Sequence, residues 1–327
     1  MPARVAFPSF AGSFVSRLAR LSPRRLLRSL DEIESLHGKV RGLETRVRQL
    51  VAAHESTEKT VEQLGRALAA FDPDRIQSHV TGAVAAAPLA SEPFPHVLID
   101  KLLPEDAYHQ LVKAIPPRVF FEHLDRNHQE VTVPSDLAPL LSREIWAAFY
   151  GRAVTEALVP GLVDKFREPL DRLVCRYWPR HQSLVDANIR LELLMSRILL
   201  RRPGYVIRPH RDPRWAFLTC LVYLPPRNAK QFFGTQLCSV RREPEHNSHG
   251  ALWMEDTDVE VVKSVQGDPN TALAFVNGTG AHRASIPDNV ASDTERYLYQ
   301  FQLGPSVASQ RRLLASMPAD EVARWRK

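Results

Sequence analysis

Cysteine is scarce in this sequence. Only three of the 327 residues are cysteines, and Cys175, Cys220 and Cys238 form no Cys-x-x-Cys pair. A disulfide framework or a structural zinc cluster needs more cysteines at closer spacing, so both classes are excluded. Few, scattered thiols are typical of a reducing compartment, and we expect a cytoplasmic protein.

Long apolar runs are also missing. No stretch approaches the ~20 consecutive apolar residues that a membrane-spanning helix requires. Apolar residues make up 44% of the chain and charged residues 24%, which is ordinary for a soluble globular protein. A length of 327 residues allows one large domain with an appendage.

A general excess of positive charge is absent as well, although the net charge is +6. Residues 1–50 contain nine Arg and one Lys against four acidic residues, which accounts for the whole excess. The other 277 residues carry 33 basic and 33 acidic side chains. A broad basic surface is therefore not predicted, and we expect no nucleic-acid partner.

The basic bias begins at the N-terminus, where residues 1–30 contain six Arg and neither Asp nor Glu. Phenylalanines and leucines are interspersed among the arginines. Such a segment could lie on an anionic membrane surface, and it also has the composition of a mitochondrial presequence. We favour a disordered arm over residues 1–25 that leads into a helix, with peripheral membrane contact as the alternative.

Residues 26–71 follow a heptad pattern. Apolar side chains recur every 3.5 residues on average, and β-branched residues at position a with Leu at d favour two parallel helices. In one heptad, positions a and d are occupied by the polar residues His54 and Thr57. We predict a coiled-coil helix and a homo-oligomer formed through it; a single helix packed back on its own domain is the alternative. The apolar a and d residues are Leu26, Ile33, Val40, Val47, Val61, Leu68, Leu36, Leu43, Leu50, Leu64 and Phe71.

The rest of the chain changes from helices to strands. After a linker over 72–93, in which a short helix could form, helices predominate up to about residue 177. Short apolar segments separated by Gly, Pro, Asn and Asp follow, as in an antiparallel sandwich or barrel. The predicted class is α+β, with a final helix within 306–327. The predicted strands are 94–100, a short one around 120–123, and then 190–202, 215–224, 236–240, 258–265, 271–276, 281–286 and 295–303.

Candidate metal ligands precede one of these apolar segments. His210 and Asp212 are two residues apart, so on a strand they would face the same side. An imidazole and a carboxylate are two of the three ligands of a facial-triad iron(II) site. His282 follows a later strand and a glycine turn, and could be the third. Arg296 comes 14 residues after it, and its planar guanidinium suits a carboxylate.

The chain from about 94 to 303 resembles the 2-oxoglutarate/Fe(II)-dependent dioxygenases, of the prolyl-4-hydroxylase-like branch. The resemblance implies a double-stranded β-helix, or jelly roll, supported by helices, and an oxygenase domain over 94–305. It is carried by several segments in order: Phe94-Pro-His-Val-Leu-Ile-Asp100, Arg208-Pro-His-Arg-Asp-Pro213, Leu218-Thr-Cys-Leu-Val-Tyr-Leu224, Gly234-Thr-Gln-Leu237 and Asn270-Thr-Ala-Leu-Ala-Phe275, together with His282 and Arg296.

The resemblance also implies roles for individual residues. His210, Asp212 and His282 would bind Fe(II), and Arg296 would pair with the distal carboxylate of 2-oxoglutarate. Tyr223 stands where relatives often place a tyrosine that helps to hold this carboxylate, although it could equally be a core tyrosine. The implied reaction uses O2, with ascorbate as a reductant, and hydroxylates an unactivated C–H bond of a small-molecule or peptide substrate while 2-oxoglutarate becomes succinate.

Two features depart from the family pattern. The loop over 287–294 is longer than usual, and Arg202 stands before the Pro-Gly turn where relatives often have Tyr. The chain also contains a second His-x-Asp pair, His123 and Asp125, followed by His128 and Glu130, which we interpret as a surface loop.

Other functions stay open at this point. One is a jelly-roll binding or scaffold protein that acts through its coiled coil, and another is a cupin-like metal enzyme without the co-substrate. We expect Trp215 and Trp253 to pack in the core or at its rim rather than to stack on a substrate.

Overall fold

The computed structural model describes residues 23–125, 128–133, 139–225, 231–243 and 251–319, together with Val322 and Trp325. The arm predicted over 1–25 lies outside these residues except for its last three. The chain divides into two units, residues 1–63 and 64–327, which are described separately. Within the described part of the chain, no helix has the length and apolar character needed to cross a membrane.

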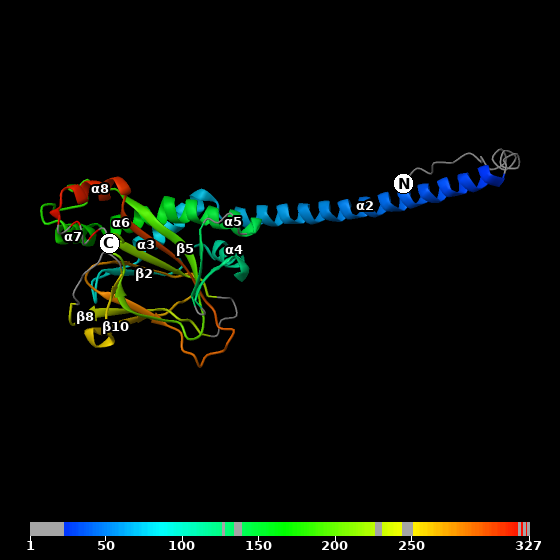
Figure 1. Ribbon diagram of the computed structural model, residues 1–327. Helices are drawn as coiled ribbons and strands as arrows, with labels where there is room; N and C mark the ends of the chain where they lie inside the picture. Colours follow the sequence, from blue (N-terminus) through cyan, green and yellow to red (C-terminus); the bar gives the residue numbers. More distant parts are fainter. Residues whose placement is uncertain are drawn as a thin grey trace. The chain divides into compact units, whose positions relative to one another are not determined.

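The first unit consists of helix α2 (Pro23–Ala69), whose last residues belong to the second unit (Figure 1). The helix covers almost all of the predicted heptad segment. Its heptad residues from Ile33 to Val61 are exposed to solvent, among them Leu36, Leu43 and Leu50 at 58%, 63% and 65%, whereas Leu68 and Phe71 pack in the core of the second unit. The helix itself is therefore as predicted, with an apolar stripe on its surface.

Within the segment predicted as a linker, 72–93, the short helix that we expected to be possible at 75–86 does form. Helix α3 (Pro73–Ala86) begins at Asp72, whose side chain accepts a hydrogen bond from the Arg75 amide, as an N-cap residue does. Its buried residues Ile76, Val80 and Val84 are spaced four apart and join the core of the second unit. The many alanines of this segment concealed that stripe.

Two antiparallel sheets form the centre of the second unit. The larger has the order β1-β2-β11-β7-β13-β5-β4-β3, and the smaller has the order β10-β8-β12-β6-β9. The larger sheet contains β1 (Leu89–Ala90), β2 (His96–Ile99), β3 (Glu122–Asp125), β4 (His128–Thr132), β5 (Leu191–Arg201), β7 (Leu218–Tyr223), β11 (Ala272–Val276) and β13 (Arg296–Pro305). The smaller contains β6 (Val206–Arg211), β8 (Thr235–Val240), β9 (Leu252–Trp253), β10 (Val259–Val265) and β12 (Ala281–Ser285).

The order of the strands defines a double-stranded β-helix. Strands β5, β7, β11 and β13 are neighbours in the larger sheet, and β6, β8, β10 and β12 are neighbours in the smaller one. The chain crosses from one sheet to the other along this series, which is the jelly-roll arrangement. The predicted α+β class and two-sheet core are thus confirmed.

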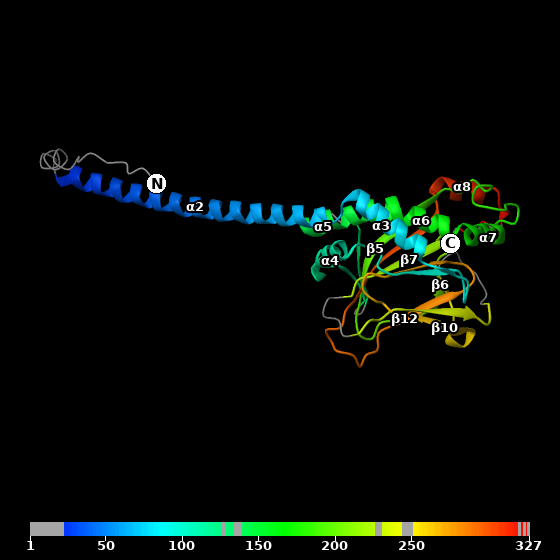
Figure 2. The same cartoon turned by 180° about the vertical axis from the view of Figure 1, so that it is seen from behind.

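Helices cover the outer face of the larger sheet (Figures 1 and 2). They are α3, α4 (Glu105–Lys113), α5 (Leu140–Ala148), the π-helix η2 (Phe149–Leu158), α6 (Val159–Lys165), α7 (Arg167–Tyr177) and α8 (Val307–Ala315). Alternate residues of the strands reach this layer: on β7, Cys220 and Val222 pack with the helices. Leu221 and Tyr223 point the other way and pack with Leu237 of the smaller sheet. The inter-sheet space is therefore lined by every second residue of each strand.

Candidate metal centre and anion site

Two histidines face each other across adjacent strands of the smaller sheet. His210 on β6 is paired with His282 on β12, so both side chains project from the same face. Their ring centroids are 4.2 Å apart. The glycine turn before β12 packs tightly against Phe94, because a Cβ at Gly280 would lie 1.8 Å from an atom of that ring.

Asp212 completes the group from just beyond the end of β6. Its Oδ1 is 3.7 Å from Nε2 of His210 and 4.0 Å from Nε2 of His282. The Thr219 hydroxyl on β7 donates to Oδ2 at 2.5 Å. Gln302 on β13 also hydrogen-bonds this carboxylate. The larger sheet therefore orients the carboxylate and the smaller sheet the two imidazoles.

These three side chains fit a divalent metal. Their ligand atoms lie within 4.8 Å of one another, and the structure groups no other set of three such residues among those it describes. Nδ1 of His210 lies 2.9 Å from the Arg208 carbonyl, which fixes the tautomer that leaves Nε2 free to ligate. Two imidazoles and one carboxylate on one side of a site are the donor set of non-haem iron(II) centres.

The protonation states agree with this fit. Burial lowers the pKa of His282 to about 3, and the proximity of His210 lowers it further than Asp212 raises it, so the ring is neutral. Burial alone would raise the pKa of Asp212. The imidazoles and the hydrogen bonds from Thr219 and Gln302 outweigh that effect and hold this pKa below its usual value. A buried, ionised carboxylate beside the neutral ring of His282 favours a bound cation.

Arg296 lies on the inner face of β13 with no carboxylate partner among the described residues. Its side chain is buried, at 7% exposure. Nε donates to the Phe233 carbonyl at 2.5 Å, and Nη2 lies 3.1 Å from the Gly234 carbonyl and 3.3 Å from the Thr235 hydroxyl. Burial lowers its pKa. A buried guanidinium that meets only neutral acceptors is electrostatically ready for an anion.

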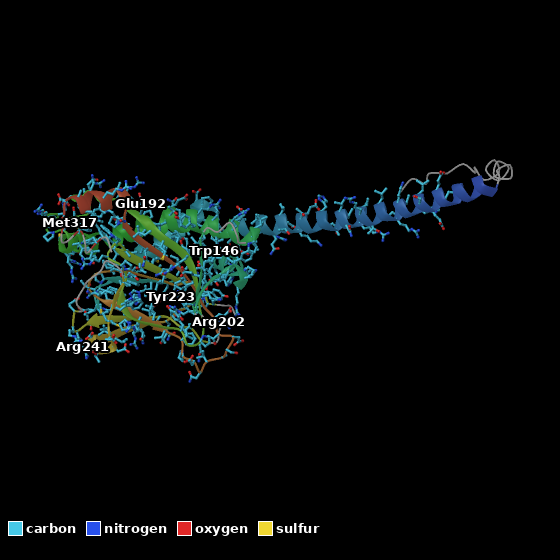
Figure 3. The ribbon with its side chains drawn as sticks, in the orientation of Figure 1. Trp146, Glu192, Arg202, Tyr223, Arg241 and Met317 are labelled. Atoms are coloured by element: carbon cyan, nitrogen blue, oxygen red, sulfur yellow. The ribbon has the colours of Figure 1, made fainter. Side chains whose placement is uncertain are left out.

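Tyr223 borders the same place. Its ring centre is 5.8 Å from Cζ of Arg296, and its hydroxyl donates to Thr235 at 2.9 Å. Figure 3 shows Tyr223 between the two sheets. The two residues also line one small cavity together with Phe233 and Gly267. The tyrosine is both part of the interior and a neighbour of the arginine.

The other residues singled out in the sequence lie elsewhere. Arg202 points toward the 287–294 loop, where Nη2 is 3.5 Å from the Ser292 carbonyl (Figure 3). His128 and Glu130 belong to strand β4 of the β3–β4 hairpin, in the polar segment predicted as a loop, and Glu130 is bound by Arg197 through both oxygens. The side chains of His123 and Asp125 are outside the described residues.

Trp215 packs as predicted, against the rings of Trp178 and Trp325. Trp253 lies at the rim, as one of the two predicted positions allows. It stands on edge strand β9 opposite His210, with ring centroids 4.9 Å apart, and is 47% exposed. It is therefore the exposed neighbour of a predicted metal ligand.

Sequence reasoning missed Thr219 and Gln302, which hold Asp212. Both are polar residues in segments that are otherwise apolar, and this was the available signal. Thr219 is opposite Gln302 on neighbouring strands, so both reach the same face.

Comparisons with known proteins find similarity in solved structures. No protein-family model matches the chain. A search of curated proteins finds no match either. An oxidoreductase of the 2OG-Fe(II) oxygenase family from Burkholderia pseudomallei is 10% identical, covers 64% of this chain and 84% of its own, and has a TM-score of 0.38. A prolyl-4-hydroxylase from Pseudomonas putida is 11% identical, with 71% and 99% covered and a TM-score of 0.38.

HygX from Streptomyces hygroscopicus, solved with nickel, 2-oxoglutarate and hygromycin B bound, is 13% identical, with 65% and 83% covered and a TM-score of 0.37. The matched structures come from the class that the sequence motifs resemble.

Proposed function

We propose that the chain is an Fe(II)- and 2-oxoglutarate-dependent dioxygenase that hydroxylates an unactivated C–H bond of a small-molecule or peptide substrate. One observation carries the proposal: a buried cluster of His210, Asp212 and His282 shares the interior of one double-stranded β-helix with Arg296. Arg296 is a buried cation with no carboxylate partner among the described residues. A metal triad alone would also suit a cupin-like enzyme, and the arginine is what favours a 2-oxo dicarboxylic acid.

Two groups of residues in this interior would bind two different ligands. His210, Asp212 and His282 would hold Fe(II), and Arg296 with Tyr223 would hold the distal carboxylate of 2-oxoglutarate. The chemistry supplied by the iron is oxidation of a C–H bond with O2, in which 2-oxoglutarate takes one oxygen atom and leaves as succinate and CO2. Leu221, Leu273 and Leu298 lie between the sheets and exclude water from this space.

Binding and turnover together test the proposal. The wild-type protein should bind 2-oxoglutarate when Mn2+ replaces iron, measured by titration calorimetry. With Fe(II), O2 and ascorbate it should form succinate at a slow rate without substrate, and faster when a mixture of metabolites or peptides contains the substrate. A protein that binds neither Mn2+ nor 2-oxoglutarate would favour the scaffold function instead.

Helix α2 motivates a second proposal, about assembly. We propose that two copies form a parallel coiled coil through residues 26–71, because apolar a and d residues such as Val40, Leu43 and Val47 are exposed along the helix. In that arrangement position g of one helix faces position e of the next heptad in the other, which brings Lys39 toward Glu44 of the second copy. In the same organisation of the chain, the oxygenase domain would span residues 94–305.

Contact of the 1–25 arm with a membrane stays a prediction. Six arginines and no acidic residue within 1–30 favour anionic surfaces. Co-sedimentation of the full chain with vesicles of phosphatidylserine and phosphatidylcholine, compared with phosphatidylcholine alone, tests it.

A further inference from the structure

A second buried arginine stands directly beside Arg296. Arg201, the last residue of β5, is the register partner of Arg296 on β13. Opposite residues of paired strands project from the same face. That face is the inner one, since Leu199 and Leu298, two residues along each strand, belong to the cluster between the sheets.

Within the described part of the chain, no acidic side chain neutralises the charge of Arg201. The residue is 2% exposed. Nη1 donates to the carbonyls of Gln129 at 2.8 Å and Leu200 at 3.0 Å, and Cζ lies 5.0 Å from the ring centre of Tyr205. Nε is buried and has no hydrogen-bond partner. No carboxylate of the described residues forms an ion pair with Arg201.

Another arginine of strand β5, Arg197, does have an acidic partner. Arg197, four residues before Arg201, is neutralised by both oxygens of Glu130, and Nη1 lies 2.7 and 2.8 Å from them. Its guanidinium also donates to Gln300. The fold therefore provides an acid for one arginine of β5 and none, among the described residues, for the one that faces Arg296.

Placing Arg201 opposite Arg296 is costly in the free protein. Like charges directly opposite in a sheet destabilise it, and burial removes the water that would screen them. Burial lowers the pKa of Arg201, and the positive charge of Arg296 lowers it as well. An anion bound between the two guanidiniums would remove this repulsion and would use the free Nε of Arg201.

We propose that Arg201 is a second anchor for the distal carboxylate of 2-oxoglutarate and, with Arg296, makes the site selective for dicarboxylic 2-oxo acids. This inference rests on the proposed function. Tyr205 borders Arg201 on the same side, with its ring centre 5.0 Å from Cζ, and its hydroxyl hydrogen-bonds the guanidinium.

Selectivity between two acids tests the assignment. 2-Oxopentanoate has the same chain as 2-oxoglutarate but ends in a methyl group, so it lacks only the distal carboxylate. Dissociation constants for both acids are measured by calorimetry with Mn2+ in place of iron, on wild type and Arg201→Gln. Glutamine keeps an N–H donor for the Gln129 carbonyl and removes the charge.

We expect Arg201→Gln to weaken 2-oxoglutarate binding about 10- to 100-fold, the range for losing a charged hydrogen bond, and to change 2-oxopentanoate binding less than about threefold. Arg202→Gln is the matched control and should leave both constants unchanged. Arg201→Lys retains the charge and should restore part of the preference.

Three results would overturn the assignment. Unchanged selectivity in Arg201→Gln contradicts it, and so does an equal loss for both acids, which indicates a structural role. In both cases wild-type binding of 2-oxoglutarate leaves the proposed function standing. A wild type that does not bind 2-oxoglutarate contradicts the proposed function itself, and Arg201 loses its role with it.

Discussion

His210 and Trp253 are register partners on the outermost two strands of the smaller sheet, with ring centroids 4.9 Å apart. They extend a row that runs across the sheet from Leu237 through His282. One end of this row is buried in the interior and the other is the exposed indole. Trp253 therefore marks the exposed edge of the smaller sheet beside the predicted metal ligand His210.

This relationship predicts a fluorescence signal for metal binding. Ni2+ bound at His210 should quench the fluorescence of Trp253, because a paramagnetic ion close to an indole quenches its emission efficiently. We expect titration with Ni2+ to lower the tryptophan emission of the wild type. Trp253→Phe should remove most of the change, whereas Trp215→Phe, in the distant cluster with Trp178, should keep it. Quenching that survives in Trp253→Phe would contradict this placement of the metal.

Asp212→Ala should abolish metal binding while leaving the fold intact. At 100 times its dissociation constant, Mn2+ stabilises a protein that binds it only when folded by about 2.7 kcal/mol. The wild type should therefore melt at a higher temperature with Mn2+, and Asp212→Ala should show no shift. The metal-free variant should be less stable than the metal-free wild type, because the buried donors of Thr219 and Gln302 lose their acceptor. His128→Ala tests the other histidine cluster and should keep the full shift; loss of the shift there would mean that the metal binds elsewhere.

The sequence predicted the larger sheet well for a physical reason. Strands β7 and β11 are buried on both faces, so they appear as continuous apolar runs bounded by turns. Strand β6 was missed because it contains two arginines, a proline and a histidine in six residues. Strand β4, in the polar segment predicted as a loop, was missed for the same reason, whereas β3 overlaps the short strand predicted around 120–123. Polar strands at a sheet edge resemble loops in composition.

For the candidate site too, the sequence predicted some features and not others. His210, Asp212, His282 and Arg296 were found from residue types and spacing, and the structure brings them into one interior. The reason given for Asp212 was wrong, since it lies past the end of β6 and is oriented by hydrogen bonds from the opposite sheet. Arg201 could not be distinguished from its neighbour in sequence. A shift of one residue in register reverses which side chain faces inward, and no motif determines that.

Tyr223→Phe decides between the two interpretations of this tyrosine. As a ligand to the co-substrate its hydroxyl should contribute a hydrogen bond, so 2-oxoglutarate should bind about tenfold more weakly. As a core residue alone it should change only stability, by about 1 kcal/mol through the lost bond to Thr235. Calorimetry with Mn2+ and thermal unfolding on the same sample separate these outcomes. We expect the weaker binding.

The three cysteines should react differently with a thiol reagent. Cys175 is exposed, whereas Cys220 and Cys238 are buried between other side chains. Burial raises the pKa of both buried thiols, to about 11 for Cys238, so little thiolate forms near neutral pH. Iodoacetamide should modify one cysteine in the native protein and all three after unfolding, and peptide mass spectrometry should identify the first as Cys175. Rapid native labelling of Cys220 would contradict the buried position of β7.

The coiled coil can be tested through the charges beside its seam. In a parallel, in-register pair, Lys39 of one helix faces Glu44 of the other, so each dimer contains this ion pair twice. Lys39→Glu should weaken the dimer through like-charge contacts, and the double variant Lys39→Glu with Glu44→Lys should restore it. Sedimentation equilibrium of the full chain measures the dissociation constant. Leu43→Lys should disrupt the dimer most, because it places a charge in the apolar seam. Thr45→Lys on the outer face is the control and should have no effect. A monomeric wild type would contradict the coiled coil, and failure of the charge exchange in a dimeric one would contradict the parallel register.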